Sequence, residues 1–296
     1  MTEPLRLSTM MGTYKKTTPL KGGELRSPLL TLDFADVETA QKAFKRVVRK
    51  QEFDLAELAI ITFLQAFDHG KPFVLLPFVM NGNFHHKSLL CRDDASFTAR
   101  DLAGRKVAMR SYPQTTPTWV RGILSDEYGV DLRAVQWLSQ EEAHVEEARD
   151  PPWVTRLNAS LGLEELLIAG EVDAIISGGA LSGDPRVRTL IPNPAEAARD
   201  WNRRTGAIPI NHMVVIRREI AEQRPDIVRE VERLLLEARR VSGDLPAEGA
   251  VDLQPTGFER TRQALEMAIR YAHDQGLIGR RFAVEELYGS VAKALS

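Results

Sequence analysis

The chain has 296 residues, a length that suggests two domains or lobes. Hydrophobic residues make up 43% and charged residues 27% of the sequence, which is ordinary for a soluble globular protein. The net charge is −2 and no long basic run occurs, so nucleic acid is not an expected partner.

The cysteine content and the hydropathy of the sequence indicate where in the cell the protein is expected. Cys91 is the only cysteine, so no intramolecular disulfide forms, which fits a reducing environment. The first twenty residues lack the apolar core of a signal peptide, and no apolar run is long enough to span a membrane. We therefore expect a cytoplasmic protein that does not bind membranes.

Strands and helices alternate along the first third of the chain, which is typical of an α/β architecture. Apolar residues at helical spacing predict a helix over residues 36–51, and a second helix is expected over residues 55–70. The continuous apolar run at residues 72–80 is typical of a strand covered on both faces. Further strands are expected at residues 6–11 and 27–34.

The rest of the chain continues the alternation and then becomes helical. Residues 117–130 are expected to form a helix with Pro117 at its first position and Thr116 as its cap. Residues 163–177 predict a short helix, a glycine break and a strand. Other strands are expected at residues 105–110, 134–138 and 206–218, and other helices at residues 225–242, 258–277 and 283–295. A long loop is expected at residues 243–257.

Several chemical classes are disfavoured by missing motifs. The sequence has no dinucleotide-binding G-x-G-x-x-G, no P-loop and no G-x-S-x-G nucleophile elbow. His85 and His86 are adjacent, so on a regular strand they would point to opposite faces and could not share one metal ion. We therefore predict no metal site.

Six segments resemble, in order, the 4,5-dihydroxyphthalate decarboxylase family. They are MGTYKKTTPL, FDLAELAIITFL, PFVLLPFVMNGNFHHKS, TPTWVRGIL, TGAIPINHMVVIR and DQGLIGRRFAVEELY, and the resemblance covers nearly the whole chain. In addition, the stretches DLAGRKVAMRSYPQTTPTWVRGILSDEYGVDL and LLIAGEVDAIIS resemble the second lobe of type II periplasmic-binding-protein folds.

This resemblance implies two α/β lobes around a central cleft, joined by two crossover segments. The first lobe would hold residues 1–92 and 210–296, and the second would hold residues 93–209. The crossings would lie near Cys91–Asp94 and Gly206–Ile210. Ligands commonly bind in such clefts between lobes.

The resemblance also implies an activity: loss of CO2 from a hydroxylated aromatic carboxylic acid, without a cofactor, after a proton is added to the ring carbon. The substrate would be a small aromatic carboxylate. Whether the chain forms a homo-oligomer is left open. Two other functions also stay open, a small-anion binding protein without catalysis and a dehydratase of the same fold.

The candidate catalytic residues are His86, His212 and Glu57. Histidine titrates near neutral pH, so His86 or His212 could donate the proton, or either could have a structural role. Glu57 could accept hydrogen bonds from phenolic hydroxyls, orient a histidine, or simply favour a helix start.

Residues 110–119 offer an anion site in the predicted second lobe. Free amides at a helix start bind anions, and the hydroxyls of Thr115 and Thr116 add donors there. Arg110 could add a charge that pairs with a carboxylate. Trp119 could cover an aromatic ring or belong to the core.

The remaining candidate substrate-binding residues are Tyr14, Lys15, His85 and Ser177. Ser177 precedes two glycines that would let the backbone approach a ligand, or that form a mere turn. Lys15 and His85 stand where the family favours an aspartate and an arginine, and Asn211 also departs from the family pattern. These departures suggest a substrate other than a dicarboxylate bound in the family's manner.

Overall fold

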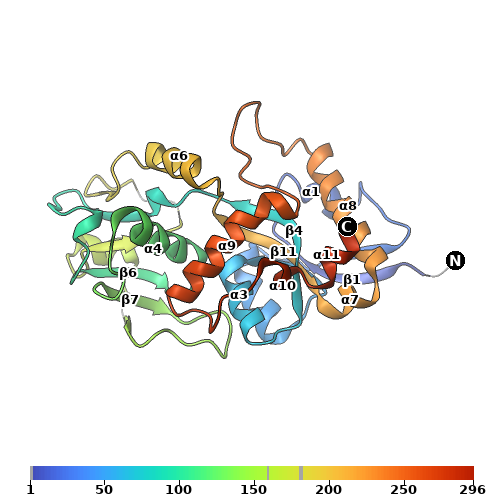
Figure 1. Cartoon of the computed structure of the whole chain (residues 1–296), viewed down its shortest axis with the longest axis horizontal. Coiled ribbons are helices and arrows are strands. Elements are labelled where there is room, and N and C mark those ends of the chain that lie inside the picture. Colours follow the sequence, from blue (N-terminus) through green and yellow to red (C-terminus); the bar gives the residue numbers. More distant parts are fainter. Residues whose placement is uncertain (1–2, 159, 180–182) are drawn as a thin grey trace.

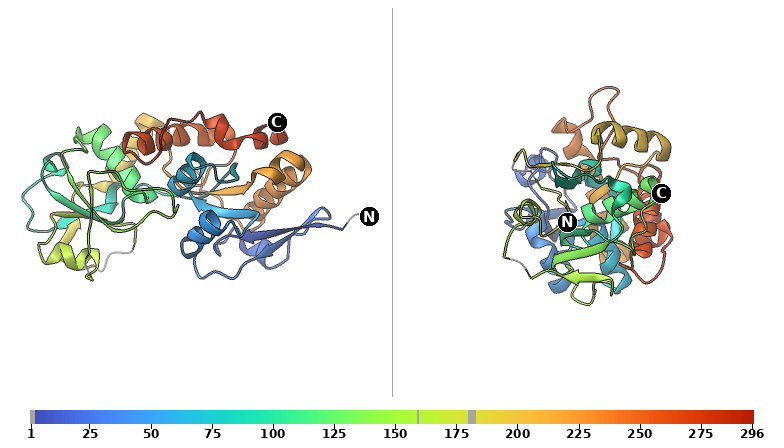
Figure 2. Two further views of the ribbon diagram at one scale, coloured as in Figure 1. Left: turned by 90° about the horizontal axis from the view of Figure 1, so that it is seen from below. Right: turned by 90° about the vertical axis from the view of Figure 1, so that its left-hand side faces the viewer.

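The protein consists of two α/β lobes that lie side by side along its longest axis (Figure 1). The computed structural model describes residues 3–158, 160–179 and 183–296. Figure 2 shows the same two lobes from below, with helix α9 (Phe258–Asp274) running along one side of both. The two-lobed α/β architecture is as predicted.

The first lobe is built on a five-stranded sheet with the order β2-β1-β3-β11-β4. Strands β1, β2 and β3 run parallel, and β11 pairs antiparallel with both β3 and β4. Insertion of β11 into the middle of the sheet brings late-sequence residues next to the N-terminal strands. The strands are β1 (Leu5–Met10), β2 (Leu30–Phe34), β3 (Leu55–Ala59), β4 (Phe73–Gly82) and β11 (Ile210–Arg217).

The second lobe is built on a six-stranded sheet with the order β10-β5-β9-β6-β7-β8. Its strands β9, β6, β7 and β8 run parallel, whereas β5 is antiparallel to β9 and β10. The strands are β5 (Leu89–Arg92), β6 (Lys106–Ser111), β7 (Gln136–Glu141), β8 (Val154–Arg156), β9 (Ala174–Ile176) and β10 (Val187–Thr189).

Helices cover both sheets. In the first lobe they are α1 (Thr18–Lys21), α2 (Ala40–Lys45), the π-helical η1 (Arg46–Lys50), α3 (Ile60–Asp68), α7 (Arg218–Gln223), α8 (Pro225–Val241), α9, α10 (Val284–Tyr288) and α11 (Ser290–Leu295). In the second they are the 3-10 turn η3 (Ala99–Asp101), α4 (Thr115–Tyr128), α5 (Leu163–Ile168) and α6 (Pro194–Thr205). None of the described helices is long and apolar enough to cross a membrane.

Several predicted helices differ from the observed ones. The helix expected over residues 55–70 begins with strand β3, because its first five residues are all buried between neighbouring strands. The helix expected over residues 36–51 begins only at Ala40 and changes to π-helix at Arg46. The cap of α4 is Gln114, so Thr116 lies inside its first turn rather than at the cap.

Two other differences concern the C-terminal half. Gly289 divides the helix expected over residues 283–295 into α10 and α11. Helix α6 was not predicted, although Pro194 at its start and Gly206 in left-handed conformation at its end are typical helix boundaries.

The segment between β4 and β5 forms the first crossover. Because β5 pairs within the second sheet, the chain leaves the first lobe at residues 83–88, which include the 3-10 turn η2 (His86–Ser88). This lies before the boundary expected at residues 92 and 93. The second crossover leads from α6 into β11, where the backbone amide of Asn83 donates to the carbonyl of Pro209 at 3.1 Å.

Candidate active site

Glu57 is the centre of a buried polar cluster in the first lobe. It lies in β3, has no exposed surface, and accepts three hydrogen bonds. The backbone amide of Gly12 donates to its Oε2 at 2.9 Å, and the hydroxyl of Tyr14 donates to Oε1 at 2.7 Å. Nδ1 of His212 lies 2.6 Å from the same Oε1. Both carboxylate oxygens are therefore fully engaged inside the protein.

The sheet topology explains why Glu57 meets His212. Strand β11 pairs with β3 so that Val214 is opposite Glu57 and His212 is opposite Ala59. His212 and Glu57 are thus diagonal neighbours on one face, a spacing that long side chains can bridge.

Hydrogen bonds keep this carboxylate charged despite its burial. Burial by itself raises the pKa of Glu57, but the hydrogen bond and charge of His212, with the donors Gly12 and Tyr14, outweigh burial and lower it. Burial and the Glu57 charge raise the pKa of Tyr14, so its hydroxyl stays a donor. Since Glu57 is ionised, Nδ1 of His212 carries the proton of their hydrogen bond.

The other ring nitrogen of His212, Nε2, is not part of the hydrogen bonds to Glu57. Nε2 has no hydrogen-bond partner among the described residues, and 8% of the side chain remains exposed. The ring of Phe44 packs edge-on against the imidazole, with ring centroids 5.1 Å apart. Glu57 therefore fixes the orientation of the His212 ring through Nδ1.

A loop of the second lobe approaches the same place. His144 follows β7, contacts Phe44 with ring centroids 5.7 Å apart, and lies 2.8 Å from the hydroxyl of Thr62 through Nδ1. Burial lowers the pKa of His144 to about 4, so it is neutral at pH 7. Neither His144 nor Phe44 was predicted as a site residue, because nothing in their local sequence distinguishes them.

His85 and His86 are both buried at the first crossover. Nε2 of His85 lies 2.8 Å from Oδ1 of Asn211, the residue before His212. Nδ1 of His86 is buried without a hydrogen-bond partner among the described residues, and its ring centroid lies 6.1 Å from that of Trp201. Burial lowers the pKa of both imidazoles to about 4, so both are neutral at pH 7.

In the second lobe, the start of α4 has unused polar groups. Thr115 is buried, and its hydroxyl has no hydrogen-bond partner among the described residues. The hydroxyl of Thr116 faces Gly178, where an added Cβ would lie 3.0 Å from it. The backbone amide of Ser177 donates to the carbonyl of Ser88 at 2.9 Å, which ties this loop to the first crossover.

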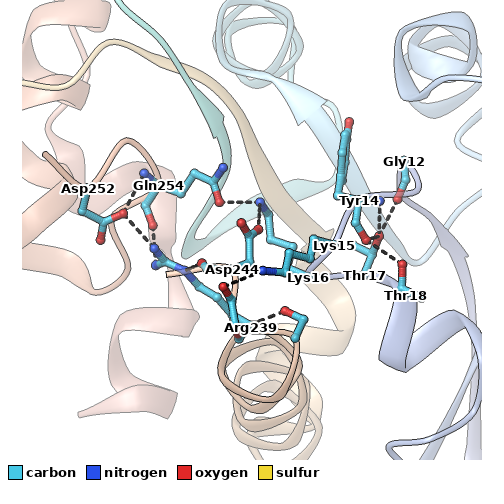
Figure 3. Close-up of polar contacts among 12 residues, drawn as sticks. Gly12, Tyr14, Lys15, Lys16, Thr17, Thr18, Arg239, Asp244, Asp252 and Gln254 are labelled. Atoms are coloured by element: carbon cyan, nitrogen blue, oxygen red, sulfur yellow. Dashed lines mark hydrogen bonds and ion pairs between the residues drawn. The ribbon is translucent and has the colours of Figure 1, made fainter. Parts of the chain in front are cut away.

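Three other predicted binding residues are engaged elsewhere. Arg110 pairs with Glu141 at 2.8 Å on the exposed surface. Trp119 is buried in the core and donates from Nε1 to the carbonyl of Ile210 at 2.9 Å. Lys15 donates from Nζ to the carbonyl of Gly243 at 2.9 Å, on the exposed side of the first lobe (Figure 3). In this arrangement none of the three has a free polar group at the Glu57 cluster.

No group of three or more potential metal ligands occurs among the described residues. The arrangement combines a buried carboxylate and its histidine in the first lobe with a polar helix start in the second lobe.

The chain is similar over nearly its whole length to curated decarboxylases. It is 26% identical to a 4,5-dihydroxyphthalate decarboxylase of Comamonas testosteroni, with 96% of each chain covered. It is 28% identical to a 4,5-dihydroxyphthalate decarboxylase of Pseudomonas putida, over 67% of this chain and 82% of that one. These relatives confirm the resemblance predicted from the motifs, although no family model matches the sequence.

The fold is shared with a solved binding protein. The periplasmic aliphatic sulphonate binding protein SsuA of Escherichia coli superposes with a TM-score of 0.60 at 16% identity, covering 97% of this chain and 92% of that one. The predicted two-lobed, type II periplasmic-binding-protein-like fold is thereby confirmed.

Proposed function

We propose that this chain is a decarboxylase that removes CO2 from a hydroxylated aromatic carboxylic acid of the 4,5-dihydroxyphthalate kind, without a cofactor. The named relatives support a decarboxylase of that kind. The observation that carries the proposal for this chain is the buried Glu57–His212 pair, in which Nε2 of His212 has no hydrogen-bond partner among the described residues and 8% of the His212 side chain is exposed.

In the proposed reaction His212 is the general acid. Its Nε2 proton goes to the ring carbon that bears the carboxylate. The carbon–carbon bond then breaks, its electron pair restores the aromatic ring, and CO2 leaves. His212 regains a proton from water. The ionised Glu57 accepts the hydrogen bond from Nδ1 of His212 and so holds the imidazole ring in one orientation.

His212 suits this role better than His86. A general acid must carry a proton near neutral pH, and burial holds the pKa of His86 at about 4. No carboxylate hydrogen-bonds to His86 among the described residues, whereas His212 has Glu57 at 2.6 Å. We therefore assign proton transfer to His212 and a place in the site wall to His86.

The substrate carboxylate is proposed to lie at the start of α4. The first-turn amides of a helix carry partial positive charge, and Thr115 and Thr116 add two hydroxyls. The unpartnered, buried hydroxyl of Thr115 supports this assignment, because a buried donor without a partner costs about 1–3 kcal/mol that a bound anion would recover.

The test is a panel of hydroxybenzoates and hydroxyphthalates incubated with the purified protein. Headspace CO2 and the product are measured, and ligand binding is measured in parallel by calorimetry. We expect at least one member to lose CO2 with saturable kinetics. Tight binding of a panel member with no CO2 from any of them would contradict the proposal and favour a binding protein.

A further inference from the structure

A second buried charge lies beside the Glu57 cluster. The side chain of Lys16 is only 3% exposed, and its Nζ lies 3.0 Å from Oδ2 of Asp244. Nζ also donates to Oε1 of Gln254. Figure 3 shows this ammonium between the segment after β1 and the loop that follows α8. A lysine is seldom buried so completely unless it is paired, because its desolvation is costly.

The loop that supplies both acceptors is itself held by a buried arginine. Arg239 in α8 donates to the backbone carbonyls of Asp244 and Gln254, at 3.0 Å and 2.6 Å. Its Nη2 pairs with Asp252 at 2.7 Å. We call residues 243–257 the strap, since this stretch runs from α8 past Lys16 to α9 and bridges to Phe78 of β4 through Thr256. Arg239 thus fixes the strap so that Asp244 stays on Lys16.

The turn that carries Lys16 also carries two of the donors to Glu57. The hydroxyl of Thr17 donates to the carbonyl of Gly12 at 2.8 Å and accepts from the amide of Tyr14 at 2.8 Å (Figure 3). Nζ of Lys16 lies 5.5 Å from the ring centroid of Tyr14, whose hydroxyl donates to Glu57. Lys16 and the Glu57 donors Gly12 and Tyr14 therefore belong to one hydrogen-bonded turn.

Charge from Lys16 also reaches Glu57 directly. The charged groups that act on Lys16 are Asp244, Arg239 and Glu57, and they come from three different segments. Glu57 in turn interacts with His212 and Tyr14, and with Lys21 of α1. Burial is the largest influence on Lys16 and lowers its pKa, while Asp244 acts to raise it.

We propose that the Lys16–Asp244 pair sets the charge balance of the Glu57–His212 pair, and that Lys16 is a positioning residue of the reaction. The inference rests on the proposed function for its catalytic meaning, but the electrostatic effect is a property of the folded chain alone. Lys16 supplies a positive charge that opposes protonation of His212, and Asp244 partly cancels it.

The proposal predicts opposite effects for the two members of one ion pair. Lys16→Met removes a positive charge, so protonated His212 becomes more favourable and the imidazole titrates at higher pH. Asp244→Asn removes the cancelling negative charge but keeps a hydrogen-bond acceptor for Nζ, so the imidazole titrates at lower pH. Each displacement should be about half a pH unit, the size expected for charges that are near but not in contact.

The measurement is a histidine NMR titration of the full chain labelled with ¹³C-histidine. The His212 signal is assigned by its absence in His212→Asn. Lys42→Met is the matched control: it also removes one lysine charge, but from an exposed pair with Glu38 on the surface of α2. The control should leave the His212 titration where it is in the wild type.

The two directions separate an electrostatic role from a structural one. A merely structural ion pair would make both variants shift His212 in the same direction, or not at all, and either result would overturn the proposal. If Lys16→Met does not fold, the downward shift in Asp244→Asn, which changes one partly exposed loop side chain, still decides the matter. The titration needs no substrate, so absence of turnover would count against the proposed function and not against this inference.

Discussion

The buried charge of Glu57 is stabilised by hydrogen bonds from three donors. Its three donors come from the turn after β1 and from β11, so its ionisation depends on the folded arrangement. Although burial opposes the charge, His212, Gly12 and Tyr14 lower the pKa of Glu57 below the usual 4.5. A carboxylate with a lowered folded-state pKa stabilises the fold above its unfolded-state pKa, and this contribution is lost as pH falls through the folded value.

This gives a prediction for Glu57→Gln. At pH 7 the variant should unfold with a free energy lower than wild type by about 1–3 kcal/mol, because buried donors lose their charged acceptor. The difference should shrink as pH falls below about 4.5, where the wild-type carboxylate begins to lose its own advantage. Urea unfolding of both proteins between pH 7 and pH 3.5 measures it. A difference that stays constant over this range would contradict the account.

The sequence indicated which residues belong to the candidate site better than it indicated their contacts. Glu57 and His212 were both expected in the site through the family resemblance, but they are 155 residues apart, and only the pairing of β11 with β3 joins them. Lys16 was not predicted as a site residue, because only its neighbour Lys15 differs from the residue that the family favours. The side chain of Lys15 donates to the carbonyl of Gly243. The local sequence does not indicate which of the two adjacent lysines, Lys15 or Lys16, is buried.

Helix α9 joins the lobes through a close contact with α4. An added Cβ on Gly122 of α4 would lie 2.3 Å from ring atoms of Tyr271, so only glycine fits there. The same tyrosine donates to Asp126 at 2.6 Å and packs edge-on against Trp119. Helix α9 thus packs on the second lobe, although the rest of the C-terminal segment belongs to the first lobe.

We predict that Gly122→Ala separates α4 from α9 and lowers the free energy of unfolding by about 1–3 kcal/mol, the usual cost of overpacking. Gly162→Ala is the matched control, because its φ of −66° suits alanine and its nearest neighbour would lie at 3.4 Å. Thermal unfolding of both variants measures the effect. Equal stability of the two would show that the α4–α9 contact adjusts freely.

Helices and strands were predicted well where the hydrophobic pattern extends over many residues. They were predicted poorly where the segment is short and wholly buried. The strand at residues 72–80 and the helix at residues 225–242 appear nearly as expected, as β4 and α8. Residues 55–59 were expected as helix because a short apolar run does not distinguish a strand from a helix. Their strand pairing is set by β1 and β11, which are distant in sequence.

In the whole molecule, ion pairs also join the two lobes. Arg49 of η1 pairs with Glu142 at 2.8 Å, and Lys71 pairs with Glu147 at 2.6 Å. These pairs are partly exposed, so each is worth about 0–1 kcal/mol and opens readily. Arg49 also donates to the backbone carbonyls of Ala143 and His144, at 3.0 Å and 2.7 Å, so hydrogen bonds add to the ion pairs of this contact.

We predict that substrate favours the closed arrangement of the lobes and reduces the radius of gyration in solution scattering. A bound molecule that touches both His212 and the start of α4 stabilises only the arrangement in which these lie close. The comparison is between free protein and protein saturated with a panel member that loses CO2. An unchanged scattering profile would remove lobe closure from the mechanism.

In the proposed reaction, His212 is oriented by Glu57 and delivers the proton to the ring carbon. The most direct test is the rate of CO2 release from the best substrate by wild type, His212→Asn and His86→Asn, each checked for native circular dichroism. We predict that His212→Asn lowers kcat by roughly 100-fold or more, the usual contribution of a general acid, whereas His86→Asn keeps most of the wild-type rate. A folded His212→Asn variant with near-normal kcat would contradict the account.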